Sequence, residues 1–354
     1  MKLKFDYRYV LLLAIPVAFL AETLHWGNIV QFLTAAIGIV PLAGFIGEAT
    51  EELTVHTGPK IGGMLNATLG NAAELIITIV AIKAGVLELV IASITGSILG
   101  NLLLVTGLSI LVGGLRNGTQ KFSQPQATTN ATTMILAVVA LMIPAIFGHS
   151  IDVTHHQALQ PFSLGVAIVM IVIYGLGIIY SFTAREDDTP LVRPSAHDTH
   201  VAAWSVQKSL IVLAVATIAI VFLSELLVGS VEHVVAQLGW SEFFVGIIIV
   251  PLVGNAAEHL VAVQVALKNQ MTLSLEIAIG SSLQIALFVA PVLMIVAALM
   301  GVELSFNFNQ FELVALASAG VVGVFVIKDG KSNWLEGAQL LALYLILGVA
   351  FFFI

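Results

Sequence analysis

The stretch GNAAELIIT, residues 70–78, returns almost unchanged as GNAAEHLVA, residues 254–262. Each copy places an ionisable glutamate, Glu74 or Glu258, well inside a long apolar run. A charged side chain at the centre of a bilayer costs about 2.5–3.5 kcal/mol on insertion scales, so it normally faces a partner or a water-filled cavity. Two such glutamates in matching motifs indicate a functional site.

The composition predicts a polytopic membrane protein. Of the 354 residues, 59% are hydrophobic and 10% are charged, whereas soluble domains carry roughly 25% charged residues. Runs of about 20 apolar residues are long enough to cross a lipid bilayer. Cysteine is absent, which excludes disulfides and thiolate metal sites. The net charge of −8 argues against nucleic acid as a partner.

Apolar runs bounded by Gly, Pro and charged residues predict an all-α fold of 11 transmembrane helices. The predicted spans are 9–27, 28–47, 61–84, 86–114, 126–148, 160–183, 208–230, 240–268, 271–300, 306–328 and 334–354. The basic, then apolar start of the chain is interpreted as an uncleaved first helix rather than a signal peptide. A single long polar connection, 184–207, separates the sixth and seventh spans and is expected to be a cytoplasmic linker.

The basic residues support this count and its orientation. With the N-terminus in the cytoplasm, twelve of the thirteen Lys and Arg residues fall on the cytoplasmic side, as the positive-inside rule requires. These are Lys2, Lys4, Arg8, Lys60, Arg116, Lys121, Arg185, Arg193, Lys208, Lys268, Lys328 and Lys331, and Lys83 alone lies opposite. One missed or invented span would scramble the pattern.

The two motifs belong to an internal repeat. Gly254 follows Gly70 by 184 residues, and the same offset carries Gly96-Ser97 onto Gly280-Ser281. Because five spans, an odd number, separate the copies, the halves should cross the membrane in opposite directions. We therefore expect an extra N-terminal helix (1–27), a first inverted repeat (28–183), the linker and a second inverted repeat (208–354). Such repeats are typical of secondary transporters that bind substrate near the midplane.

The residues around the glutamates favour a hard divalent cation. Neither span offers a Lys or Arg at helical spacing to pair with its glutamate, so a cation or a proton is the natural partner. Asn71 and Asn255 lie one helical turn before each glutamate, and the adjacent Gly70 and Gly254 permit a local break that exposes carbonyl oxygens. Ca²⁺ takes 6–8 oxygen ligands of these kinds.

The same carboxylates are suited to carrying protons. Burial and a neighbouring carboxylate both disfavour the charged form, so the pair is expected to hold protons without metal and to release them when a divalent cation arrives. His259 directly follows Glu258 and is either a proton relay or a hydrogen-bonded packing residue. Occupancy by Ca²⁺ or by H⁺, but not both, is the thermodynamic basis of an antiporter.

At these motifs the sequence resembles the cation/proton exchanger family, the Ca²⁺/H⁺ antiporters of the Ca²⁺/cation antiporter superfamily. GSILGNLLLVTG at Gly96, GSSLQIALFVAP at Gly280 and GEATEEL at Gly47 reinforce the resemblance. It implies a transport core of the third, fourth, eighth and ninth spans, in which Glu74 and Glu258 bind Ca²⁺ and exchange it for protons. Asn71, Asn255 and nearby backbone carbonyls, including those at Gly70 and Gly254, would complete the site. The implied pathway residues are Ser97, Asn101, Ser281, Ser282 and Gln284.

Acidic residues outside the core have two interpretations. Glu48, Glu51 and Glu52 recur at helical spacing before the third span and form either a solvated helix face or a cation-attracting gate. Glu225, near the outer end of the seventh span, is either an interfacial side chain or an outer vestibule ligand. The central loop lacks the strongly acidic segment that family members often carry there, which argues against regulation by Ca²⁺ at that loop.

We therefore predict a Ca²⁺/H⁺ antiporter that works by alternating access, with Ca²⁺ as transported substrate and H⁺ as counter-ion. A Na⁺/Ca²⁺ exchanger and a Mn²⁺/H⁺ antiporter of the same fold are the alternatives. The absence of a carboxylate at the Gly96 and Gly280 turns favours protons. No nucleophile–base pair or HExxH motif indicates an enzyme. The short N-terminus is expected of a prokaryotic form in the plasma (inner) membrane. The sequence does not distinguish a monomer from a homo-oligomer.

Overall fold

The computed structural model describes residues 7–154, 158–183 and 202–354, so residues 184–201 of the predicted linker lie outside the described part. The first half contains α1 (Tyr7–Leu11), α2 (Ala14–Thr23), α3 (Asn28–Leu69), α4 (Ala72–Ala84), α5 (Leu87–Leu99), η1 (Gly100–Val105), α6 (Thr106–Asn117), β1 (Gln120–Lys121), α7 (Gln124–Thr154) and α8 (Leu159–Thr183). The second half contains α9 (Val206–Leu238), α10 (Glu242–Phe244), η2 (Val245–Ile249), α11 (Val250–Gly254), α12 (Ala256–Leu267), α13 (Met271–Gln284), η3 (Ile285–Val289), α14 (Ala290–Leu299), α15 (Gln310–Ile327), β2 (Lys331–Ser332) and α16 (Trp334–Phe352).

Most predicted spans coincide with long apolar helices. Within the described residues, eight helices are long and apolar enough to cross a membrane, or nine if the bent pair Glu242–Gly254 and Ala256–Leu267 is one span. The predicted spans 9–27 and 61–84 are not among them, because α1, α2 and α4 are short. The count of 11 helices and the two-repeat arrangement therefore stay predictions.

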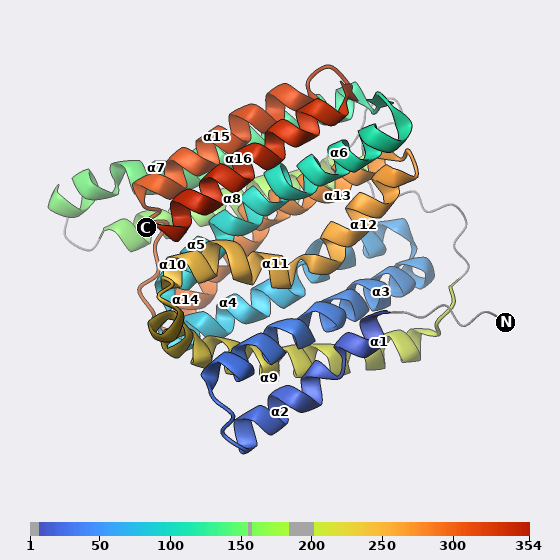
Figure 1. Ribbon diagram of the computed structural model, residues 1–354. Coiled ribbons are helices and arrows are strands. Elements are labelled where there is room, and N and C mark those ends of the chain that lie inside the picture. The colour runs from blue at the N-terminus through green and yellow to red at the C-terminus, as the bar shows by residue number, and fades with distance from the viewer. Residues whose placement is uncertain (1–6, 155–157, 184–201) are drawn as a thin grey trace.

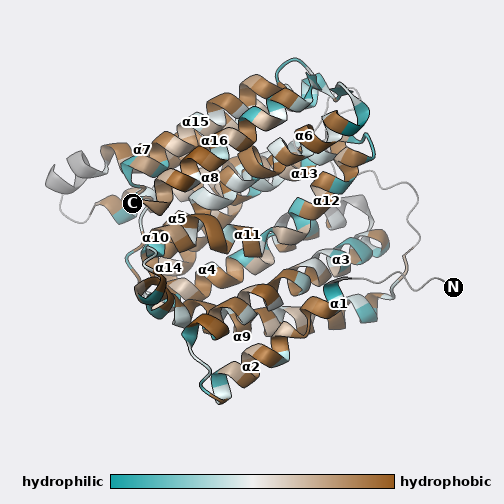
Figure 2. Ribbon diagram, viewed as in Figure 1, coloured by the Kyte–Doolittle hydropathy of each residue, from teal (hydrophilic) through white to brown (hydrophobic). Residues whose placement is uncertain are grey.

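The long helices lie side by side in one bundle (Figure 1). Helices α3 and α9, one from each half, pack along each other, and α16 packs on α6. Hydrophobic residues cover the lengths of the helices, and hydrophilic residues gather mainly at their ends (Figure 2). This distribution fits a bundle that is surrounded by lipid.

The first long helix runs further than predicted. The predicted span ends at residue 47, but α3 continues to Gly58 through Glu48, Glu51 and Glu52, whose helical spacing is compatible with a helix. Gly58 has φ 80°, a positive value that favours glycine, and it marks a kink from which the helix continues to Leu69.

Three π-helical segments interrupt the central helices: η1, η2 and η3. Within η1, the backbone carbonyl of Asn101 accepts a hydrogen bond of 2.9 Å from the hydroxyl of Thr106, five residues later. Extra residues of this kind often occur at functional sites. Each segment lies close in sequence to a candidate site residue or motif, and the hydropathy pattern gives no sign of it.

One short pair of strands departs from the predicted all-α fold. In β1 and β2, Gln120 pairs with Ser332 and Lys121 pairs with Lys331 in antiparallel register. The strands connect the α6–α7 turn to the α15–α16 turn. Because the two turns meet at the same end of the bundle, their backbone N–H and C=O groups form hydrogen bonds with each other.

Candidate cation site

Both GNAAE motifs break their helices at the asparagine. Asn71 has φ −99° and ψ 22°, and Asn255 has φ −105° and ψ 6°, so neither is helical. Each asparagine occupies the N-cap position of the next helix, where a side chain usually accepts a bond from the helix backbone. Neither side chain does so here. Both amides are therefore free to bond across to other helices.

The motifs cross, so that the glycine of each lies against the glutamate of the other. A Cβ placed on Gly70 would lie 3.3 Å from Oε1 of Glu258. A Cβ placed on Gly254 would lie 3.5 Å from Cβ of Glu74. The structure thus brings together the predicted residues Glu74, Glu258, Gly70 and Gly254.

Helix α13 joins the two motifs. The hydroxyl of Ser281 lies 2.8 Å from Oε2 of Glu258 and 3.3 Å from Oδ1 of Asn71. The amide of Asn71 donates a bond of 2.8 Å to Oε1 of Gln284. On the other side, the amide of Asn255 donates a bond of 3.3 Å to the Ser97 hydroxyl on α5. Four helices thus contribute to one polar cluster.

The cluster retains oxygen atoms that have no hydrogen-bond donor. Both carboxylate oxygens of Glu74 and Oδ1 of Asn255 are buried without a partner. A buried acceptor of this kind costs roughly 1–3 kcal/mol when it is unsatisfied. In the part of the chain that the structure describes, neither Glu74 nor Glu258 forms a salt bridge. The atoms left available to a cation, the carboxylate oxygens of Glu74 and Oδ1 of Asn255, are all oxygens, which suit a hard cation.

Carboxylate and imidazole side chains alone cannot provide all the ligands of a cation at this site. Across residues 7–154, 158–183 and 202–354, no group of three His, Asp or Glu side chains is arranged to hold a metal ion. A cation between Glu74 and Glu258 would therefore take further oxygens from amides, hydroxyls, backbone carbonyls or water. This is the usual mixture for Ca²⁺ and differs from the nitrogen and sulfur ligands of Zn²⁺.

The two halves differ in how tightly they pack around the cluster. Glu74 is 1% exposed, whereas Glu258 is half-buried. A Cβ on Gly96 would collide with the backbone carbonyl of Ile247 in η2, while a Cβ on the matching Gly280 would meet nothing within 4 Å. Helix α5 is thus sealed against η2, whereas the equivalent point of α13 is open.

The remaining predicted core residues lie beside the cluster without joining its hydrogen bonds. Nε2 of His259 and Nδ2 of Asn101 are buried without partners. Cε1 of His259 would lie 4.0 Å from a Cβ on Gly100, which places the ring beside η1. The hydroxyl of Ser282 donates to the carbonyl of Ala278 in its own helix, at 3.1 Å. Ser282 therefore differs from its neighbour Ser281, which reaches Glu258.

Glu52 connects the two halves. It is 5% exposed and accepts a hydrogen bond of 3.0 Å from the backbone N–H of Trp204, just before α9. Nε2 of His56 lies 2.8 Å from the backbone carbonyl oxygen of Trp204. Together, Glu52 and His56 bind both backbone groups of Trp204 and attach the end of α3 to the start of the second half.

The other predicted entrance residues lie away from the cluster in the hydrogen-bond network. Glu48 forms an ion pair of 2.7 Å with Arg8 of α1. Glu51 is half-buried on the same helix and also has an interaction partner. Glu225 is exposed, and its carboxylate lies 3.5 Å from Nζ of Lys83. An exposed pair of this kind contributes little to stability.

The sequence analysis missed one buried carboxylate. Glu312 in α15 is 2% exposed, accepts a bond of 3.0 Å from the Thr95 hydroxyl and forms a capping box with Asn309. The spacing Asn-x-x-Glu could have revealed the cap. Both oxygens of Glu312 have donors, in contrast to those of Glu74.

The sequence pattern of the family described as sodium/calcium exchanger protein matches residues 27–183 and 208–353. The chain belongs to this family. A Ca²⁺/H⁺ antiporter of Aphanothece halophytica is 46% identical to this exchanger over 360 residues, which cover 97% of this chain and 95% of that protein. The Ca²⁺/H⁺ antiporter ChaA of Bacillus subtilis is 43% identical over 340 residues, which cover 96% of this chain and 96% of that protein. The resemblance to Ca²⁺/H⁺ antiporters is thereby confirmed.

Solved structures agree with this assignment. The structure of native YfkE matches 99% of the exchanger with a TM-score of 0.85 and 40% identity, and is itself covered to 100%. The H⁺/Ca²⁺ exchanger CAX shares the fold, with a TM-score of 0.74 at 14% identity over 98% of this chain and 91% of its own. With its apolar helices and its transporter relatives, the exchanger is an integral membrane protein.

Proposed function

We propose that this exchanger transports Ca²⁺ against H⁺ and that Glu74 and Glu258 form one site that both ions occupy in turn. The observation that carries the proposal is the crossing of the two motifs, which sets each glutamate beside the glycine of the other. The unsatisfied oxygens of Glu74 and Asn255 support it, because a cation would replace the missing donors. Ca²⁺/H⁺ antiporter relatives that span the whole chain favour the same ions.

Charge explains why exchange rather than leakage should result. One Ca²⁺ or two protons neutralise the two carboxylates, whereas an empty ionised site leaves two charges uncompensated. Each uncompensated charge costs about 2.5–3.5 kcal/mol in the membrane. A rearrangement of the empty site is therefore disfavoured, and each crossing should carry either Ca²⁺ or protons. A difference of one pH unit supplies about 1.4 kcal/mol for each proton returned.

Ser281 connects the protonation of Glu258 to the other motif. Its hydroxyl carries one hydrogen but lies within bonding distance of two acceptors, Glu258 and Asn71. When Glu258 is ionised, the hydrogen points to that carboxylate. When Glu258 is protonated, it donates to the Ser281 oxygen, and the hydroxyl turns to Asn71. Proton binding in one half thus changes the hydrogen bonding of the other.

Alternating access is supported by the unequal packing of the two halves. Gly96 is closed against Ile247, while Gly280 faces open space. We infer that the two ends of the cluster open in turn, and that Gly280 comes into close contact when Gly96 separates. The orientation predicted from the basic residues places the closed α5–η2 end on the outside, so this state would be closed on that side. In this proposal, the N-terminus lies in the cytoplasm.

The experiment is Ca²⁺ uptake into proteoliposomes with an acidic interior, followed with ⁴⁵Ca²⁺. We expect uptake without Na⁺ and its collapse when a protonophore with an ionophore removes the proton gradient. Glu74→Gln and Glu258→Gln should each abolish uptake. Glu312→Gln is the matched control, a buried carboxylate outside the cluster, and should retain it. Wild-type rates in either of the first two variants would overturn the proposed site.

The same vesicles separate the alternatives. A Na⁺/Ca²⁺ exchanger would take up Ca²⁺ only when Na⁺ is loaded inside, and a proton gradient would not replace it. A Mn²⁺/H⁺ antiporter would show Mn²⁺ uptake that saturates at lower concentration than Ca²⁺ uptake. We expect Ca²⁺ uptake that is driven by the proton gradient without Na⁺. We also expect Ca²⁺ uptake to saturate at a lower concentration than Mn²⁺ uptake.

A further inference from the structure

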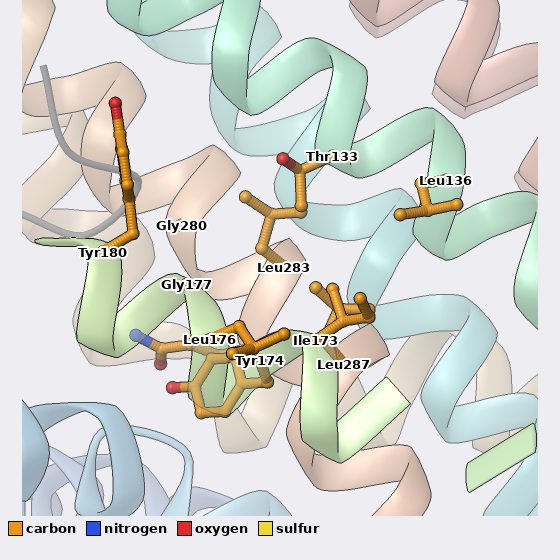
Figure 3. Close-up of a pocket in the computed structure, with 11 residues that line it drawn as sticks. Thr133, Leu136, Ile173, Tyr174, Leu176, Gly177, Tyr180, Gly280, Leu283 and Leu287 are labelled. Carbon is orange, nitrogen blue, oxygen red and sulfur yellow. The ribbon is translucent and has the colours of Figure 1, made fainter. Parts of the chain in front are cut away.

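A cavity of about 280 Å³ lies between α7, α8 and the α13–η3 helix, and neither glutamate of the ion site lines it. Figure 3 shows the side chains that surround it. Tyr174, Leu176 and Tyr180 contribute from α8, Leu136 from α7, and Gly280 and Leu283 from α13. The lining is mostly apolar, so the cavity is a poor path for ions and a suitable site for an apolar molecule.

The size and position of the cavity suit a ligand from the bilayer. Its volume is nearly twice that of an engineered cavity of about 150 Å³ that binds benzene, and close to the lower limit of about 300 Å³ for ligand pockets. Leu136, Leu176 and Tyr180 are 51%, 55% and 45% exposed on apolar helices long enough to cross the membrane. A molecule dissolved in the lipid can therefore reach the cavity without crossing water.

One polar group of the lining is unused. Tyr174 is 8% exposed, its ring stacks on Phe288 at 5.4 Å, and its hydroxyl is buried without a hydrogen-bond partner. The other polar side chains have partners: Gln284 accepts from Asn71, and Thr133 donates to the carbonyl of Thr129. An unsatisfied buried hydroxyl is costly. A ligand that supplied one acceptor would remove that cost.

We propose that this cavity binds a membrane-dissolved apolar molecule with one hydrogen-bond acceptor, a carbonyl or ether oxygen held by the Tyr174 hydroxyl. Gly280 contributes no side chain, which leaves the space open beside α13. The phenol at the buried end orients the ligand, and the leucines enclose its apolar body.

The cavity shares residues with the ion site, which gives the ligand a means to act on transport. Gln284 lines the cavity and fixes Asn71, and Gly280 directly precedes Ser281, the partner of Glu258. An occupant would restrain this part of α13 and slow its rearrangement. This effect on transport rests on the proposed Ca²⁺/H⁺ exchange, whereas the binding itself does not.

The test uses benzophenone, an apolar ketone that inserts into nearby C–H bonds when it is illuminated. Purified exchanger in lipid vesicles is labelled over a range of concentrations, without any ion gradient, and the labelled peptides are identified by mass spectrometry. We expect saturable labelling confined to residues 133–136, 173–180 and 280–287, which line the cavity. Labelling that never saturates, or that spreads evenly over the lipid-facing helices, would overturn the proposal.

Three variants define the site. Tyr174→Phe removes only the hydroxyl and should raise the half-saturating concentration about tenfold, as expected for one lost hydrogen bond. Thr133→Phe fills the cavity and should abolish saturable labelling. Tyr344→Phe, at a tyrosine that is 9% exposed in α16, is the matched control and should behave as wild type. Equal labelling of all three variants would contradict the assigned site.

A separate measurement tests the coupling. Saturating benzophenone should slow proton-driven Ca²⁺ uptake by wild type more than by Tyr174→Phe at the same concentration. Saturable labelling without such slowing would overturn the coupling and leave the binding site standing. Absence of proton-driven uptake in untreated vesicles would contradict the proposed function, while the labelling result would still decide the cavity.

Discussion

Oε1 of Glu258 lies 3.3 Å from the point where a Cβ on Gly70 would stand. The two residues belong to different halves of the chain and are separated by 188 positions. Glycine is favoured there because a side chain would crowd the carboxylate and the carbonyl oxygen of Asn66. This contact gives a reason for the glycine of the first motif, whereas a Cβ on Gly254 would lie at an ordinary contact distance of 3.5 Å from Glu74.

Gly70→Ala should weaken Ca²⁺ transport. The added methyl group would lie beside Glu258 and 2.7 Å from the carbonyl oxygen of Asn66, so the end of α3 must shift. Overpacking of this kind costs about 1–3 kcal/mol, and we expect the KM for Ca²⁺ to rise about tenfold. Gly229→Ala, at a position with nothing within 4 Å, is the control and should leave the KM unchanged. An unchanged KM in Gly70→Ala would show that this contact does not shape the site.

Ser281→Ala should shift the pH dependence of Ca²⁺ uptake. The variant loses the hydrogen bond of 2.8 Å to Glu258, which favours the ionised carboxylate. The proton is then held more tightly, so the pH at which uptake is half-maximal should move upward. A bond to a charged group contributes about 1.5–3 kcal/mol, which corresponds to a shift of about one to two pH units.

The neighbouring serine provides the control for this shift. The hydroxyl of Ser282 bonds its own helix at Ala278, so Ser282→Ala should keep the wild-type pH profile. Uptake is measured at a series of external pH values with a constant pH difference. Identical profiles for the two variants would remove Ser281 from the coupling between protons and Ca²⁺.

The glycines at 96 and 280 should respond differently to alanine. Gly96→Ala places a methyl group against the backbone of Ile247 and should lower the Tm, because the closed α5–η2 contact must open. Gly280→Ala meets open space in this state and should leave the Tm unchanged. If Gly280 becomes packed in the opposite state, the same variant should still lower the turnover rate. Full turnover in Gly280→Ala would contradict alternation of these two contacts.

Glu52 should act through its hydrogen bond rather than its charge. Glu52→Ala leaves the backbone N–H of Trp204 without its acceptor and should lower the free energy of unfolding by about 1–3 kcal/mol. Glu52→Gln retains an acceptor oxygen and should keep both stability and uptake. Glu232→Ala, at an exposed position of α9, serves as the control. If Glu52→Gln lost uptake with normal stability, the negative charge would be needed for cation entry.

Much of the site was readable from spacing alone. The constant offset between Gly70 and Gly254 predicted that the two glutamates face each other, and the glycines indicated local breaks in their helices. The exact partners required coordinates, because nothing in the pattern distinguishes Ser281, which reaches Glu258, from Ser282, which bonds its own helix.

Other features leave no trace in hydropathy. The π-helical segments insert one residue into an apolar stretch, and the apolar character continues through them. Helix α3 continues through the acidic segment, so the end of the apolar run at residue 47 does not mark the end of the helix. The Gly96-Ser97 and Gly280-Ser281 pairs have the same letters, so only packing reveals that one is closed and the other open.

The most direct measurement is proton release when Ca²⁺ binds to the purified exchanger in weakly buffered solution. If Glu74 and Glu258 hold either protons or Ca²⁺, titration with Ca²⁺ at neutral pH should acidify the solution until the site is saturated. Glu74→Gln and Glu258→Gln should each reduce both the binding and the release, while Glu312→Gln should retain them. Ca²⁺ binding at full affinity without proton release in the wild type would contradict the shared site.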